Sequence, residues 1–298
     1  MQEITSLVQT GNRKALARFI SWVENDVPGY ENQLEELHII PTPIIGVTGP
    51  PGAGKSTLIN ALAGHWLEQG KKVAILAIDP SSPFNQGSLM GDRLRMSEHF
   101  LNANLFIRSM ASRGSLGGLA PKVFEVCDVL RAAQFDIVII ETVGVGQSEV
   151  EIAALADTTV LVLVPEAGDE IQTIKSGVME IADVFVLNKS DRAGADIFQK
   201  NLVQLSHENA QGNWEVPVYK TVASQKEGIV ALADGILQHA ALPVKGAKKI
   251  HLLAQKALLL IKAMRTRDIK LPQLESELET LSQEAGFNLY RYIKKYNP

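Results

Sequence analysis

The chain has almost no cysteine, no excess of positive charge and no long apolar run. Cys127 is the only cysteine in 298 residues, so no intramolecular disulfide can form and nothing indicates an oxidising compartment. Its apolar neighbours predict a buried helical position. The formal net charge of −4 argues against nucleic acid, which needs a basic face. No apolar stretch is long enough to span a bilayer, and Met1-Gln2-Glu3 does not begin a secretory signal. We expect a cytosolic protein with no nucleic-acid or membrane partner.

The most informative segment is an apolar strand-like stretch that enters a glycine-rich turn and then an apolar helical pattern. Residues 42–57 read TPIIGVTGPPGAGKST, which contains the G-x-x-x-x-G-K-S pattern of a phosphate-binding loop. Its glycines let the backbone point N–H groups at phosphate oxygens. We expect Lys55 to reach the β- and γ-phosphates and Ser56 to bind Mg²⁺. The predicted nucleotide-binding residues of this loop are Gly49, Pro50, Pro51, Gly52, Ala53, Gly54, Lys55, Ser56 and Thr57.

Apolar strand-like runs alternate with helical patterns along most of the chain. Continuous apolar runs such as Val160–Val164 are typical of a parallel sheet that is covered on both faces. We therefore predict an α/β fold of the P-loop NTPase type, with a mostly parallel sheet, helices on both faces and nucleotide at the carboxyl ends of the strands. The predicted strands are 43–48, 73–78, 104–108, 136–141, 158–164, 183–188 and, more weakly, 216–220.

Helical patterns flank this alternating region at both ends. Residues 1–41 are predicted to form a helical N-terminal extension, 42–242 the P-loop nucleotide-binding domain, and 243–298 a helical C-terminal arm. The arm carries two apolar stripes, and Pro272 is expected to break the second.

The choice of base is indicated by Asn188-Lys189-Ser190-Asp191, directly after a predicted strand. In an N-K-x-D pattern the aspartate accepts from the N1–H and N2–H groups of guanine, a pairing that rejects adenine. We expect Lys189 to lie over the base and Asn188 to join this loop to the phosphate loop. Ala223 and Ser224 follow the last strand and are predicted to offer backbone contacts to the guanine carbonyl. A polar loop without this role is the alternative.

A further set of residues is predicted to sense the γ-phosphate. Glu141 ends a predicted strand and Gly144 follows three residues later, in the places of the Asp and the Gly of a D-x-x-G segment. In such a segment the carboxylate holds Mg²⁺ through water, and the glycine N–H contacts the γ-phosphate. Asp79 and Asp92 are also placed to assist the metal, although such residues are often helix caps. Which of the two lies closer stays open. The predicted catalytic residues are Lys55, Asp79, Asp92 and Glu141, and the predicted metal ligands are Ser56, Asp79, Asp92 and Glu141.

A glutamine directly after Gly144 would orient the attacking water. Gln147 instead comes three residues after that glycine. We therefore expect slow intrinsic hydrolysis of GTP.

These motifs together resemble the ArgK/MeaB family of P-loop GTPases. The segments that carry the resemblance are GPPGAGKST, DPSSP, GDR-x-RM, SRGSLGGL, ETVGVGQSE, PEAGDEIQTIKSG and NKSD. The resemblance implies a homodimer, formed through the C-terminal arm, that hydrolyses GTP to GDP. It also implies a chaperone that assists cofactor loading and protection of an adenosylcobalamin-dependent acyl-CoA mutase of the methylmalonyl-CoA mutase type. It further implies an extra switch at residues 168–175, besides those at 79–92 and 141–149.

Three alternatives stay open. A nucleotide-dependent kinase linked to lysine, arginine and ornithine transport needs a second substrate pocket, which no segment indicates. A scaffold with an inactive nucleotide site would not need an intact Lys55 or Asp191. A nickel-inserting GTPase needs clustered cysteine and histidine ligands. Ligand spacing is absent among the histidines, which are His38, His65, His99, His207, His239 and His251.

Overall fold

The computed structural model divides into two compact units, Met1–Pro243 and Val244–Pro298. No helix among the described residues has both the length and the apolar composition needed to cross a membrane. The residues that the structure describes are 2–79, 101–111, 122–142, 148–168, 178–208, 214–242, 246–284 and 286–296.

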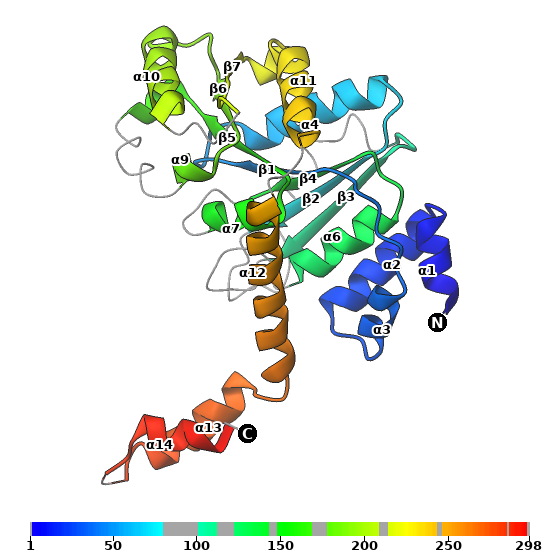
Figure 1. Cartoon of the computed structure of the whole chain (residues 1–298), viewed down its shortest axis with the longest axis vertical. Coiled ribbons are helices and arrows are strands. Elements are labelled where there is room, and N and C mark those ends of the chain that lie inside the picture. The colour runs from blue at the N-terminus through cyan, green and yellow to red at the C-terminus, as the bar shows by residue number, and fades with distance from the viewer. Residues whose placement is uncertain are drawn as a thin grey trace. The chain divides into compact units, whose positions relative to one another are not determined.

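A parallel sheet forms the centre of the first unit (Figure 1). Its seven described strands follow the order β3-β2-β4-β1-β5-β6-β7, and every neighbouring pair is parallel. The predicted fold class is therefore confirmed. The strands are β1 (Ile44–Thr48), β2 (Val73–Asp79), β3 (Leu105–Ala111), β4 (Ile137–Glu141), β5 (Thr158–Leu163), β6 (Val184–Asn188) and β7 (Val218–Thr221).

The apolar runs of the strands arise because both faces of the sheet are buried. On β1, Ile44 joins the core on one face and Ile45 joins the core on the other. On β5, Val160 and Leu161 divide in the same way between the two faces. Successive side chains of a strand point to opposite faces, so burial on both sides requires an apolar residue at every position.

Two helices cover one face of the sheet, α4 (Lys55–Glu68) and α11 (Ile229–Ala240), as Figure 1 shows. α4 follows β1 directly and buries Trp66 completely among the strands. Burial of a side chain of this size supplies about 2–3 kcal/mol of transfer free energy. The apolar side of α4 thus fixes the helix whose first turn follows the glycine-rich loop.

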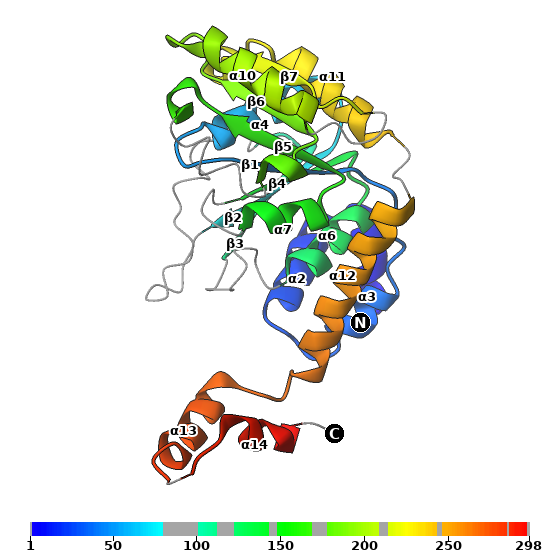
Figure 2. The same cartoon turned by 60° about the vertical axis from the view of Figure 1, so that its left-hand side comes forward.

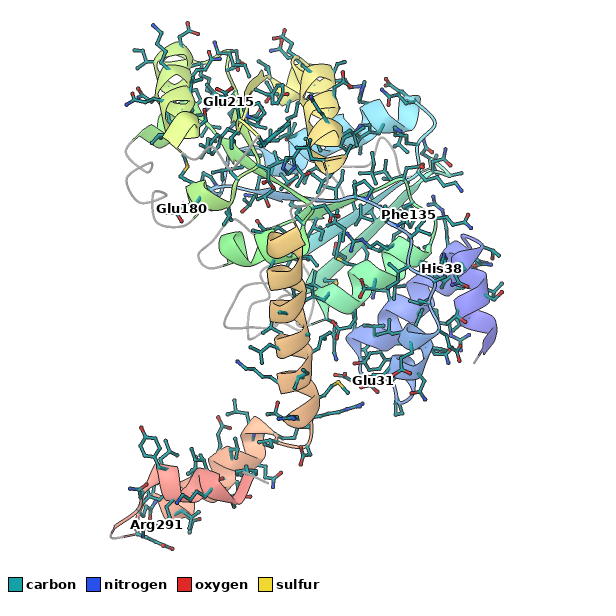
Figure 3. All side chains as sticks on the ribbon, in the orientation of Figure 1. Glu31, His38, Phe135, Glu180, Glu215 and Arg291 are labelled. Carbon is teal, nitrogen blue, oxygen red and sulfur yellow. The ribbon has the colours of Figure 1, made fainter. Side chains whose placement is uncertain are left out.

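The opposite face is covered by α6 (Val123–Ala132), α7 (Ser148–Leu155), α9 (Val178–Ile181) and α10 (Ala195–Glu208). Cys127 is buried on α6, which confirms its predicted core position. Phe135, labelled in Figure 3, lies just before β4, and its ring centroid is 6.0 Å from that of Phe106 on β3.

The N-terminal helices share this second core. They are α1 (Gln2–Gln9), α2 (Arg13–Glu24) and α3 (Tyr30–Glu35), and Figure 2 shows α2 beside α6. Phe19, Ile20 and Val23 of α2 are completely buried in the cluster that contains the α6 side chains. Lys122, just before α6, donates to Tyr30 Oη over 2.7 Å. The helices before the sheet therefore rest on the core of the first unit.

The second unit consists of α12 (Gly246–Arg265), α13 (Leu271–Leu281), α14 (Leu289–Ile293) and a short helix at Lys294–Tyr296. Pro272 lies in the first turn of α13, where a missing N–H costs no hydrogen bond, so it begins this helix and does not interrupt it. Glu277 of α13 accepts hydrogen bonds from Lys295 and from Tyr292 Oη, the latter over 2.8 Å. The Lys295 bond, followed by that of Tyr292, lowers the pKa of Glu277 to about 2.

Candidate functional site

The glycine-rich turn between β1 and α4 passes very close to neighbouring parts of the fold. Gly49 has φ +140°, and a Cβ there would lie 2.1 Å from the carbonyl oxygen of Val162 on β5. Gly54 has φ +89°, and a Cβ there would lie 2.5 Å from Nδ2 of Asn188. Glycine is needed at both positions because the backbone conformation and the space each exclude a side chain.

The turn ends at the N-terminus of α4. Gly54 is the N-cap and has no side chain to satisfy the first N–H groups, and the first turn carries no acidic residue. Free N–H groups at a helix N-terminus, together with the helix dipole, make a site for an anion. The backbone that begins α4 is therefore suited to phosphate oxygens.

Lys55 places its ammonium group over this turn. Its Nζ donates to the carbonyl oxygens of Gly49 and Pro50, over 2.8 and 3.1 Å. The residue is buried, with 7% of its surface exposed. These bonds fix the positive charge beside the N–H groups of the loop, where a β- or γ-phosphate could replace part of its carbonyl contacts.

Ser56 and Glu141 form a hydrogen bond at the start of α4. The Ser56 hydroxyl donates to Glu141 Oε1 over 2.6 Å, and both residues are buried. Glu141 ends β4, which pairs with β1, so the sheet delivers this carboxylate to the start of α4. A hydroxyl and a carboxylate are hard oxygen donors of the kind Mg²⁺ prefers, and Mg²⁺ usually takes its other ligands from phosphate and water.

The remaining residues of the predicted metal and phosphate set are only partly placed. Asp79 is the last residue of β2, and β2 pairs with β4 through Ala77 opposite Glu141. The backbone of Asp79 therefore ends at the same edge of the sheet as Glu141. Asp92 and Gly144 lie outside the described residues, and their roles stay predictions.

Asn188 joins the loop that is predicted to read the base to the glycine-rich loop. Its Nδ2 donates to the carbonyl oxygen of Ala53 over 2.9 Å. Its Oδ1 accepts from Thr221 Oγ1 over 3.1 Å and from the Ala223 N–H over 3.2 Å. The predicted link between the two loops is thus confirmed as a hydrogen bond. A guanine carbonyl would have to share the Ala223 donor or bind at Ser224, so the backbone contact expected there stays a prediction.

Lys189 and Asp191 follow Asn188 in a turn. Lys189 has φ +55°, and its Nζ donates to the carbonyl oxygen of Gly52 over 2.7 Å. The Ser190 N–H donates to the carbonyl oxygen of Thr221 over 3.1 Å. Asp191 is exposed to solvent. The turn is thus held to both the phosphate loop and β7, while its carboxylate is accessible to a base.

Two contacts of this site were not predicted. Thr221 donates to Asn188 from the end of β7, and its place two residues before Ala223 is the only signal the sequence offers. Glu166, in the short helix Pro165–Gly168, forms an ion pair with Arg192, directly after Asp191. The hydrogen bond from Arg192 lowers the pKa of the Glu166 carboxyl below its ordinary value. The expected extra switch at 168–175 lies, after its first residue, outside the described residues.

The chain is similar to a known protein family and to individual proteins. A family model described as Methylmalonyl Co-A mutase-associated GTPase MeaB matches residues 16–272. A protein of Pyrococcus abyssi, named only as a GTPase, is 46% identical over 80% of this chain and 76% of its own. The methylmalonic aciduria type A homolog of Mus musculus mitochondria is 40% identical over 64% of this chain and 47% of its own.

A solved structure is also similar to this chain. The crystal structure of a protein named as an LAO/AO transport system kinase has a TM-score of 0.69 and 27% identity, and the match covers 99% of this chain and 89% of that chain. The similarity therefore extends beyond the phosphate loop to nearly the whole chain.

Replacing Lys55 by Ala should abolish GTP hydrolysis and most triphosphate binding, because the buried cation beside the loop is lost. Lys200→Ala removes an exposed lysine from α10 and is the matched control, which should keep both properties. Hydrolysis is measured as phosphate release at saturating GTP. Equal turnover by wild type and Lys55→Ala would show that this loop is not the catalytic site.

Asp191→Asn should weaken GTP binding by about 2–3 kcal/mol, because one of two guanine N–H donors loses its acceptor. Binding of xanthosine triphosphate should improve, since the amide can donate to the carbonyl at position 2 of xanthine. Titrations of wild type and variant with GTP, ATP and xanthosine triphosphate measure both effects. Equal affinity of the wild type for ATP and GTP would contradict guanine recognition.

Proposed function

This chain belongs to the family of methylmalonyl Co-A mutase-associated GTPases MeaB, and from this membership we propose that it is the GTPase chaperone of an adenosylcobalamin-dependent acyl-CoA mutase. In this role it assists cofactor loading and protects the mutase from inactivation. One observation carries the proposal: the family match spans residues 16–272, which include α12 and most of the N-terminal helices. Motifs common to all P-loop GTPases would not extend the match so far.

The geometry of the site supports a GTPase cycle. Lys55 and the N–H groups that begin α4 can bind the phosphates, and the Ser56–Glu141 pair can hold Mg²⁺. When bound, Mg²⁺ would neutralise charge that develops on the β- and γ-phosphates. Asn188 and Lys189 each bond to the phosphate loop, so the loop proposed to read the base is held to the loop proposed to bind the phosphates.

The chaperone proposal predicts a direct effect of the partner on hydrolysis. Purified cobalamin-dependent methylmalonyl-CoA mutase should bind the chain and stimulate GTP hydrolysis by roughly tenfold or more, as partners that complete a GTPase site do. Phosphate release is measured with and without mutase, and Lys55→Ala serves as the background control. An absence of both binding and stimulation would contradict the proposal.

The kinase alternative is favoured by one observation: the solved structure whose match covers 99% of this chain is that of a protein named as a transport system kinase. The two functions differ in where the γ-phosphate goes. In the experiment above, GTP labelled in its γ-phosphate should release free phosphate. Transfer of the label to a protein would support a kinase.

We also propose that the C-terminal arm makes a homodimer. Four apolar side chains of α12 expose between 46% and 69% of their surface, namely Leu258, Leu259, Ile261 and Met264. Several exposed apolar residues on one helix are typical of an interface between protein chains. A second copy of the chain is the occupant we propose for this surface.

Sedimentation of the full chain tests the dimer. The wild type should sediment as a dimer, whereas Leu259→Asp and Met264→Asp should shift it toward the monomer because a charge would be buried without a partner. Ile197→Asp, at a 70% exposed position on α10, is the matched control. A monomeric wild type, or variants that remain dimeric, would contradict this assignment.

A further inference from the structure

A groove lies on the outer surface of α1 and α2, in a part of the chain that the nucleotide-binding motifs do not use. Its volume is about 520 Å³. The helices that form it belong to the core on the α6 face of the sheet, whereas the phosphate loop begins α4 on the other face. The lining residues are Ile4, Leu7, Asn12, Lys14, Ala15, Arg18 and Trp22.

The floor of the groove is apolar. Ile4 and Ala15 are buried, and Leu7 exposes 38% of its surface. Trp22 packs edge-on against the fully buried Phe19, with ring centroids 6.4 Å apart. The accessible apolar surface is therefore continuous with the core through Trp22 and Phe19.

The rim of the groove is basic. Lys14 and Arg18 are exposed, and the guanidinium carbon of Arg18 lies 5.0 Å from the Trp22 ring centroid. Neither Asp nor Glu is among the lining residues within the described part of the chain. The rim is therefore positive although the chain as a whole has a net charge of −4. Arg and Trp are also the residues that most often dominate binding energy at protein interfaces.

The spacing of these residues indicates the shape of the partner. Lys14, Arg18 and Trp22 recur every four residues on α2, so they form one ridge along the helix. A helix laid along this ridge would meet the two cations one turn apart. It would match them with acidic residues four apart, beside apolar residues that enter the groove.

We propose that the α1–α2 groove docks an acidic amphipathic helix of the acyl-CoA mutase. The proposal rests on the chaperone function and adds the surface through which the partner is held. Apolar side chains of that helix contact Leu7 and Trp22, and its carboxylates pair with Lys14 and Arg18. The groove shares none of its lining residues with the predicted nucleotide site.

The test is the affinity of the full chain for purified cobalamin-dependent methylmalonyl-CoA mutase. Arg18→Glu and Leu7→Asp should each raise the Kd about tenfold, the loss expected for a central interface residue. Their matched controls on α10 are Lys200→Glu and Val203→Asp, the latter at a position 37% exposed. The controls should keep the wild-type Kd, and all four variants should keep the GTP affinity. Added salt should weaken wild-type binding more than binding by Arg18→Glu.

The outcomes separate this proposal from the chaperone function. A wild type that does not bind the mutase contradicts both. Wild-type binding that Arg18→Glu and Leu7→Asp leave unchanged, or that the controls weaken equally, contradicts the groove alone. If either variant misfolds, Lys14→Glu, at an exposed position on the same rim, replaces it. A change from dimer to monomer in these variants would assign the groove to contact between copies and would also overturn the proposal.

Discussion

The site depends on the close approach of the phosphate loop to β5 and Asn188. A Cβ on Gly49 would lie 2.1 Å from a backbone oxygen of β5 and one on Gly54 2.5 Å from Asn188 Nδ2, and both glycines have a positive φ that disfavours any side chain. This approach lets Asn188 hold the loop through Ala53 O and lets α4 begin directly beneath the expected phosphates. Glycine at both positions therefore favours the loop's conformation and its link to Asn188.

The charged groups at this loop are held by hydrogen bonds within the protein. Lys55 is bonded to two carbonyl oxygens and Ser56 to Glu141, so neither the cation nor the carboxylate is buried without compensation. A triphosphate and Mg²⁺ can then bind groups that are already oriented, which lowers the entropy lost on binding. Lys189, in the turn that is predicted to read the base, is bonded to the same backbone, so the predicted base site and the predicted phosphate site are connected parts of one structure.

Much of this arrangement is predictable from sequence, because it follows from local patterns. The apolar runs predict both ends of each described strand to within three residues, because strands that are buried on both faces must be apolar throughout. The loop from Gly49 to Thr57 is likewise marked by its glycines and Lys55. Contacts between distant segments are not predictable in this way: the Glu166–Arg192 ion pair and the α1–α2 groove arise only when separate elements pack together. Neither has a local pattern that would identify it.

The central claim is that this loop binds Mg²⁺ and GTP through Lys55, Ser56 and the N–H groups that begin α4. A crystal structure of the full chain with Mg²⁺ and a non-hydrolysable GTP analogue tests it most directly. We predict the triphosphate on the N–H groups of residues 52–57, with Lys55 at the γ-phosphate. We also predict the metal at Ser56 Oγ while that hydroxyl still donates to Glu141. A triphosphate bound elsewhere, or a metal that does not contact Ser56, would contradict this claim.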